Sequence, residues 1–126
     1  MKLRIRGNSL RLRISRSEMA KLLHAGVIED TIYFGEAPDA KLTYALQLTG
    51  SAQVIRVEYQ PQRVTVLLSG KAASQWASGQ EVGLYGSSST SAGQLELMVE
   101  KDFACLDGND PRDEDAFPNP NAESVC

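Results

Sequence analysis

Strict alternation of apolar and basic residues over the first fourteen positions constrains the fold more than any other feature of this chain. In each arm of the segment MKLRIRGNSLRLRI, leucines or isoleucines alternate with lysine or arginines. A period of two is typical of a strand with one buried face. Gly7 and Asn8 lie between the two arms, and glycine can adopt the positive φ that a type II′ turn requires at its first central position. The sequence therefore predicts a β-hairpin over residues 2–14.

The predicted turn also sets which residues face each other across the hairpin. It places Arg4 opposite Arg11 and Lys2 opposite Arg13. Like charges directly opposite each other destabilise a sheet, here by about 1 kcal/mol for the two pairs together, unless an anionic group covers them. We therefore expect an acidic partner, inside the chain or outside it; the alternative is a solvated basic face. The candidate partner-binding residues are Lys2, Arg4, Arg6, Arg11 and Arg13.

Charge is distributed unevenly along the 126 residues, although the net charge is only −3. Residues 1–34 hold seven Lys or Arg and three Asp or Glu, a balance of +4, whereas residues 102–126 hold one Arg and seven Asp or Glu, a balance of −6. A basic head and an acidic tail attract each other at low salt. The tail is therefore a candidate competitor for whatever the basic hairpin binds.

Length and composition indicate a single domain that can bury a core without disulfides or metals. No apolar run approaches the ~20 residues needed to span a bilayer, and the start of the chain lacks the apolar stretch of a secretory signal. We expect a cytoplasmic protein that does not contact a membrane.

The order strand, strand, helix, strand, strand occurs twice in the pattern. After the hairpin, Ser15 and Glu18 form a capping box for a short helix, and apolar stretches at 31–34 and 42–48 are typical of strands. The second half shows strands at 53–59, 64–69, 82–85 and 94–101, with a short helix near 72–77. A shift of 54 positions aligns Leu10 with Val64 and Ser15 with Ser69. This favours an internal duplication, with an unrepeated α+β domain as the alternative.

The predicted fold is mostly β (α+β): a compact antiparallel barrel-like sheet built from two ββαββ units with two short helices. Residues 1–106 would form the domain, with candidate repeats at 1–50 and 51–106, and residues 107–126 an acidic irregular extension anchored by Phe103 and Phe117. The second predicted hairpin does not repeat the charges of the first, so only one half would contact the partner. In place of Lys2, Arg4, Arg11 and Arg13 it holds Arg56, Glu58, Thr65 and Leu67.

The stretch RGNSLRLRIS at residues 6–15, followed by a short helix and a strand, resembles the start of AbrB/MazE-type swapped-hairpin domains. The resemblance covers about the first 35 residues, with a weaker echo over residues 54–86. It implies ββαββ units that pair into a barrel and bind DNA, and two such units in one chain would resemble a fused pseudo-dimer. Ser15 stands where that family has proline.

Other features extend over the whole chain: the start MKLRIRGNSLRLR, Leu-Thr-Tyr-Ala-Leu at 42–46, Glu-Lys-Asp-Phe-x-Cys-Leu at 100–106, and an acidic loop before Asn-Pro-Asn at 119–121 and a terminal cysteine. In these features the chain is similar to a family of small bacterial proteins of unassigned function. This resemblance implies no mechanism.

The two cysteines, Cys105 and Cys126, flank a run of acidic residues. Two thiolates with a carboxylate such as that of Asp107 could hold zinc or a similar metal, because soft and hard ligands together complete four-coordination. A disulfide or an interchain bridge is a second alternative, and two cysteines without a special role are a third.

Catalytic patterns are lacking. The single histidine, His24, falls in the last turn of the first predicted helix, where the helix dipole favours a cation. The serines at 87–91 lack a Gly-x-Ser-x-Gly elbow and indicate a loop between strands. We interpret the chain as a non-enzymatic binding module, without a cofactor, that contacts an acidic protein or nucleic acid through its basic hairpin. The alternative is a metal-binding or redox accessory protein using Cys105 and Cys126; the sequence does not indicate an oligomeric state.

Overall fold

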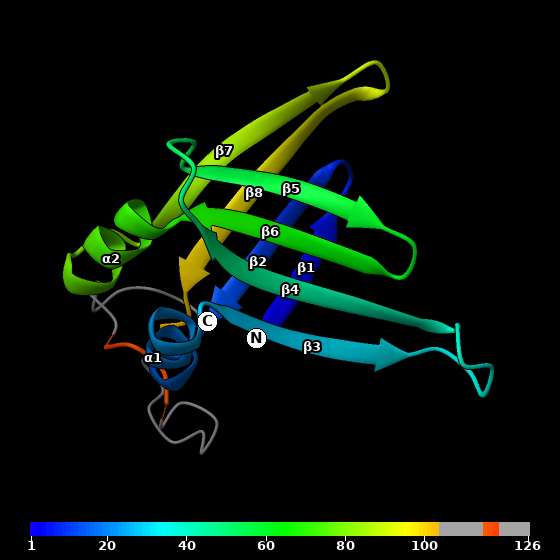
Figure 1. Cartoon of the computed structure of the whole chain (residues 1–126), viewed down its shortest axis with the longest axis horizontal. Helices are drawn as coiled ribbons and strands as arrows, with labels where there is room; N and C mark the ends of the chain where they lie inside the picture. Colours follow the sequence, from blue (N-terminus) through cyan, green and yellow to red (C-terminus); the bar gives the residue numbers. More distant parts are fainter. Residues whose placement is uncertain (104–114, 119–126) are drawn as a thin grey trace.

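The computed structural model describes residues 1–103 and 115–118. They form eight strands and two helices (Figure 1): β1 (Lys2–Arg6), β2 (Ser9–Ile14), α1 (Arg16–Ala25), β3 (Val27–Tyr33), β4 (Lys41–Thr49), β5 (Ile55–Gln60), β6 (Arg63–Ser69), α2 (Gly70–Ser78), β7 (Gly83–Thr90) and β8 (Gly93–Lys101).

The strands form two four-stranded sheets that pack against each other (Figure 1). The first sheet has the order β1-β2-β8-β7 and the second has the order β3-β4-β6-β5. Each sheet joins two antiparallel hairpins through a central parallel pair, β2 with β8 and β4 with β6. The mostly β fold with two short helices is confirmed. The described strands differ from the predicted antiparallel barrel-like sheet in two ways. They form two separate sheets, and each sheet has mixed strand direction because its central pair is parallel.

The two halves of the chain occupy corresponding places in these sheets. Exchanging β1 and β2 for β5 and β6, and β8 and β7 for β4 and β3, converts the order of the first sheet into that of the second. Hydrogen bonds at the two hairpin turns correspond as well. The Glu96 amide donates to the Asn8 carbonyl at 3.0 Å, and the Thr43 amide donates to the Gln62 carbonyl at 2.8 Å. Asn8 and Gln62 are 54 positions apart, the shift that aligns the two sequence patterns.

The register of the first hairpin is confirmed. Gly7 has φ 55°, as its place in the turn requires. The five cross-strand pairs are Lys2 with Arg13, Leu3 with Leu12, Arg4 with Arg11, Ile5 with Leu10, and Arg6 with Ser9. Because side chains alternate between the faces of a strand, the basic residues lie on the outer face while the apolar residues of β2 enter the core.

The core lies between the two sheets and beneath the helices. Its fully buried members come from both halves: Leu12, Ile14, Leu22, Leu46, Val66, Leu68, Trp76, Leu97 and Val99. Trp76 on α2 is completely buried, as its apolar helix position predicts. Strand β7 extends to Thr90, so the serines predicted to form a loop pair instead with β8. Hairpin pairing has overridden their weak strand propensity.

Both helices begin at a serine N-cap. Ser15 and Glu18 form the predicted capping box of α1, which ends at Gly26 with φ 84°. At the start of α2, the Ser69 hydroxyl accepts a hydrogen bond from the Ala72 amide at 3.3 Å. Within the described residues, no helix has the length and apolar character to cross a bilayer.

The last described residues return to the domain beside the end of β8. The Phe117 amide donates to the Asp102 carbonyl at 2.8 Å, and the rings of Phe103 and Phe117 pack edge to face with their centroids 6.3 Å apart. Ala116 is buried. Phe117 also packs against the hydrophobic core, which holds residues 115–118 on the domain.

Candidate anion-binding face

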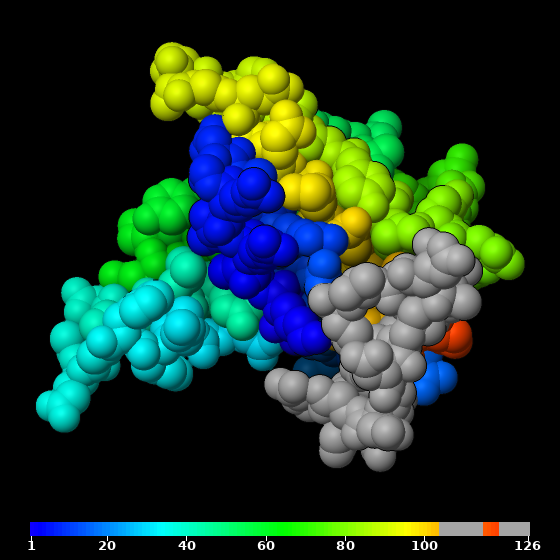
Figure 2. Space-filling view, turned by 180° about the vertical axis from the view of Figure 1, so that it is seen from behind, coloured from blue at the N-terminus to red at the C-terminus, as the bar shows by residue number. Residues whose placement is uncertain are grey.

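The predicted basic residues share the outer face of the first sheet. Figure 2 views this side of the molecule, with the first hairpin in blue beside β8 in yellow. An open depression of about 290 Å³ lies on this face. It is lined by Lys2, Leu3, Arg4, Arg11 and Arg13. The fifth predicted residue, Arg6, lies next to the turn and does not line it. We call the five basic residues the basic face.

Strand β8 brings acidic residues up to the basic face. Parallel pairing with β2 sets Glu100 opposite Arg13 and Met98 opposite Arg11. The Glu100 carboxylate accepts a hydrogen bond from Arg11 Nε and a second, at 2.7 Å, from the Tyr85 hydroxyl. Burial, together with the hydrogen bond to Glu100, raises the pKa of Tyr85 to about 12. Arg11 is therefore held in a cluster that joins β2, β8 and β7.

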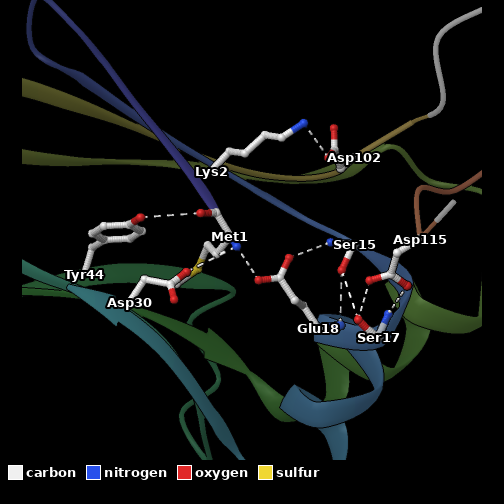
Figure 3. A network of polar contacts seen from close by, with 9 residues as sticks. All are labelled: Met1, Lys2, Ser15, Ser17, Glu18, Asp30, Tyr44, Asp102 and Asp115. Carbon is white, nitrogen blue, oxygen red and sulfur yellow. Dashed lines mark hydrogen bonds and ion pairs between the residues drawn. The ribbon is translucent and has the colours of Figure 1, made fainter. Parts of the chain in front are cut away.

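Lys2 has an acidic neighbour in Asp102, which directly follows the last residue of β8. Its Nζ lies 2.8 Å from Asp102 Oδ2 (Figure 3). Glu100 and Asp102 thus each pair with one cation of an opposed pair, Arg11 and Lys2. Nothing in the alternation of residues 2–14 could have indicated these partners, because their contact with β2 is made across most of the length of the chain.

Three arginines of the basic face remain without an acidic partner in the part of the chain that the structure describes. They are Arg4, Arg6 and Arg13. Arg4 and Arg6 are exposed and Arg13 is partly buried. Arg4 also faces Arg11 directly across the hairpin, and Glu100 pairs with Arg11 only. An anion bound beside Arg4 would therefore relieve the remaining repulsion between the two arginines.

The amino group of Met1, next to the start of β1, contacts acidic residues of α1 and of the second sheet (Figure 3). It contacts the Glu18 carboxylate and lies 3.2 Å from Asp30 Oδ2. The Tyr44 hydroxyl donates to the Met1 carbonyl at 3.5 Å. Burial opposes the charge on the amine, but the hydrogen bonds and attraction of Glu18 and Asp30 outweigh it and raise the pKa of the amine. These two acids are therefore occupied away from the basic face.

One acidic residue of the C-terminal extension contacts α1 instead of the basic face. Asp115 Oδ1 accepts from the Ser17 amide at 3.0 Å, and its other oxygen accepts from the Ser17 hydroxyl (Figure 3). Hydrogen bonds from Ser15 and Ser17 lower the pKa of Asp115. The carboxylate also lies at the N-terminus of α1, where a negative charge is favoured. Asp115 is therefore not available to compete for the arginines.

The predicted metal ligands Cys105, Cys126 and Asp107 lie outside the described residues. Among residues 1–103 and 115–118, no cluster of three or more His, Cys, Asp or Glu side chains could hold a metal ion.

Comparison with known proteins identifies the chain by its family. Residues 1–121 match the model of a family described as "Family of unknown function (DUF7009)". The chain belongs to this family. The whole-length resemblance to a family of unassigned function is thereby confirmed. No curated protein and no solved structure matches the chain, so the resemblance of its start to AbrB/MazE-type domains receives no support.

Proposed function

We propose that this DUF7009 chain is a non-enzymatic binding module that holds an acidic protein or a nucleic acid on its basic face. The observation that carries the proposal is the set of three arginines, Arg4, Arg6 and Arg13, on one exposed sheet face with no acidic partner among the described residues. The open depression beside them gives an anion direct access to Arg4 and Arg13.

The acidic residues of β8 favour a narrow partner. Glu96 and Glu100 lie on the same outer face as the arginines, one strand away from β2. Neighbouring strands are about 5 Å apart, so the positive surface is only two strands wide before the sign of the charge changes. A duplex would place phosphates over both signs, whereas an extended acidic segment can follow the hairpin alone. An acidic protein is therefore the partner that the geometry favours, and nucleic acid is tested beside it.

The proposal is tested by removing two of the unpartnered charges. Arg4→Gln with Arg13→Gln should weaken binding of labelled poly-glutamate by about 2- to 30-fold at low salt, since each exposed charge pair contributes ~0.2–1 kcal/mol. Fluorescence anisotropy at several salt concentrations measures this change, with duplex DNA and heparin as parallel probes. Lys21→Gln with Lys71→Gln is the matched control, because it removes the same charge from exposed positions on α1 and α2. Equal losses in the two double variants, or no binding by the unmodified chain, would overturn the proposal.

We further infer that the two halves of the chain descend from one duplicated ββαββ unit. The corresponding strand orders and the corresponding bonds at Asn8 and Gln62 support this inference. The function proposed above would then belong to one copy, because the position equivalent to Arg4 is Glu58, which lies 3.6 Å from Arg56.

A further inference from the structure

Strand β1 is an edge of the first sheet, and the backbone of that edge is open. Arg6 and Ser9 flank the two-residue turn and form a hydrogen-bonded pair, so the alternation of an antiparallel ladder makes Arg4 and Lys2 the next bonded residues. The amide and carbonyl groups of Leu3 and Ile5 consequently point away from β2. Neither residue makes a backbone hydrogen bond outside the hairpin to any described residue. Two donors and two acceptors are thus presented in a row.

The side chains along this edge differ between its two faces. Lys2, Arg4 and Arg6 are exposed on the outer face. On the inner face Leu3 is partly buried, and Ile5 is 63% exposed. A strand laid beside β1 would therefore have one row of side chains against three cations and the other row against apolar groups. The complementary strand alternates acidic and apolar residues.

The other sheet edges formed by the described residues lack this combination. On β3, Glu29 is paired with Arg63 at 2.8 Å, and on β5, Glu58 lies 3.6 Å from Arg56. The exposed part of β7 is mostly serine and threonine. A second copy of β1 is disfavoured on β1 itself, because it would set lysine and arginine against arginine.

We propose, as a refinement that rests on the proposed function, that the partner is an extended protein segment of alternating acidic and apolar residues that adds to β1 as a fifth strand. Backbone hydrogen bonds to Leu3 and Ile5 fix the register of the segment on β1, and its carboxylates lie against Arg4 and Arg6. Strand addition of this kind draws affinity from main-chain hydrogen bonds and specificity from alternate side chains.

The test uses the full chain and a labelled (Glu-Val)₅ peptide in three forms: unmodified, N-methylated at valine, and N-methylated at glutamate. In an antiparallel alignment the valine amides bond to the edge of β1 and the glutamate amides face away; in a parallel alignment the roles are reversed. Methylation at one residue type should therefore lower affinity at least tenfold, and methylation at the other should leave it within twofold. Charge is identical in all three peptides.

A variant of the chain provides a second readout. Ile5→Pro removes an outward amide while retaining every cation of the basic face, and proline is tolerated where the amide of an edge strand faces solvent. The variant should lose peptide binding but retain heparin binding. Equal affinity for the three peptides would overturn strand addition, as would binding of DNA or heparin without the peptide; both results leave the basic face intact as an anion site. If no polyanion binds at all, the proposed function fails with it.

Discussion

Replacing Glu100 with glutamine tests directly whether the carboxylate of Glu100 on β8 stabilises the fold and weakens anion binding by the basic face. Glutamine retains the size of the side chain, so the main change is the loss of one negative charge. Glu100 is only 9% exposed and accepts hydrogen bonds from Arg11 and Tyr85. A hydrogen bond to a charged group contributes about 1.5–3 kcal/mol, but the Arg11 side chain is 27% exposed and regains some hydration. The free energy of unfolding, measured with urea, should therefore fall by about 1–2 kcal/mol.

The same substitution should strengthen anion binding. It releases Arg11 and removes a carboxylate from beside Arg13, and two such changes of ~0.2–1 kcal/mol each raise poly-glutamate affinity by about 2- to 30-fold. Glu96→Gln is the matched control, because Glu96 lies on the same strand and the same face but is exposed and pairs with no described cation. The control should produce a smaller increase. Equal increases, or weaker binding by Glu100→Gln, would refute the argument that Glu100 lowers the affinity of the arginines for anions.

Titration of Tyr85 verifies that the intended contact has been broken. Its pKa of about 12 in the folded chain lies above the ordinary value of 10.0. A raised pKa means that the protonated phenol is favoured by folding; this contribution is complete below pH 10 and is lost as the pH rises through about 12. In Glu100→Gln the absorbance of the tyrosinate near 295 nm should show this group ionising at lower pH. An unchanged titration would show that Glu100 does not hold the phenol.

Three further predictions concern the frame and the C-terminal extension. Gly86→Ala should lower the free energy of unfolding by about 1–3 kcal/mol through overpacking, because its Cβ would collide with the Ile55 side chain; the loss should be smaller when measured in an Ile55→Ala background. Asp115→Asn should reduce the acid sensitivity of unfolding: the lowered pKa of Asp115 gives stability that is present above its ordinary value of 3.8 and lost as the pH falls through the native pKa, so the wild-type chain should weaken more between pH 5 and pH 2. If the extension competes for the basic face, replacing its acids by amides should strengthen poly-glutamate binding at low salt, with the difference disappearing at high salt. The residues to replace are Asp107, Asp110, Asp113 and Glu114.

Local rules were sufficient to predict the first hairpin and the start of the first helix. A two-residue turn and side-chain parity together allow a single register, because slipping by one residue would expose every leucine of β2. The capping box of α1 follows from the few side chains that can satisfy the first amides of a helix. Both features depend only on residues close together in the sequence, and both are confirmed.

Contacts between distant segments could not be predicted in the same way. The parallel pairing of Ser9 with Glu96 joins the two ends of the domain, and no local pattern encodes it. The carboxylates on β8 therefore could not be assigned to the hairpin, and the predicted partner was sought in the acidic extension. The end of β7 was missed for a related reason: its serines form a strand only because β8 lies beside them.

The two corners where the sheets meet show how the halves differ. At one corner β5 meets β7, and Ile55 packs so closely against Gly86 that a Cβ there would collide with the Ile55 side chain. The sheet registers place Met1 and Asp30 at the corresponding positions of the other corner, where charged groups replace this apolar contact. Because this corner is held by an ion pair and not by apolar packing, β1 remains an exposed edge strand. The half that holds the unpartnered arginines is thus also the half whose edge strand stays accessible. A strand-binding surface requires this arrangement. At the other corner, the apolar contact of Ile55 with Gly86 joins the two sheets.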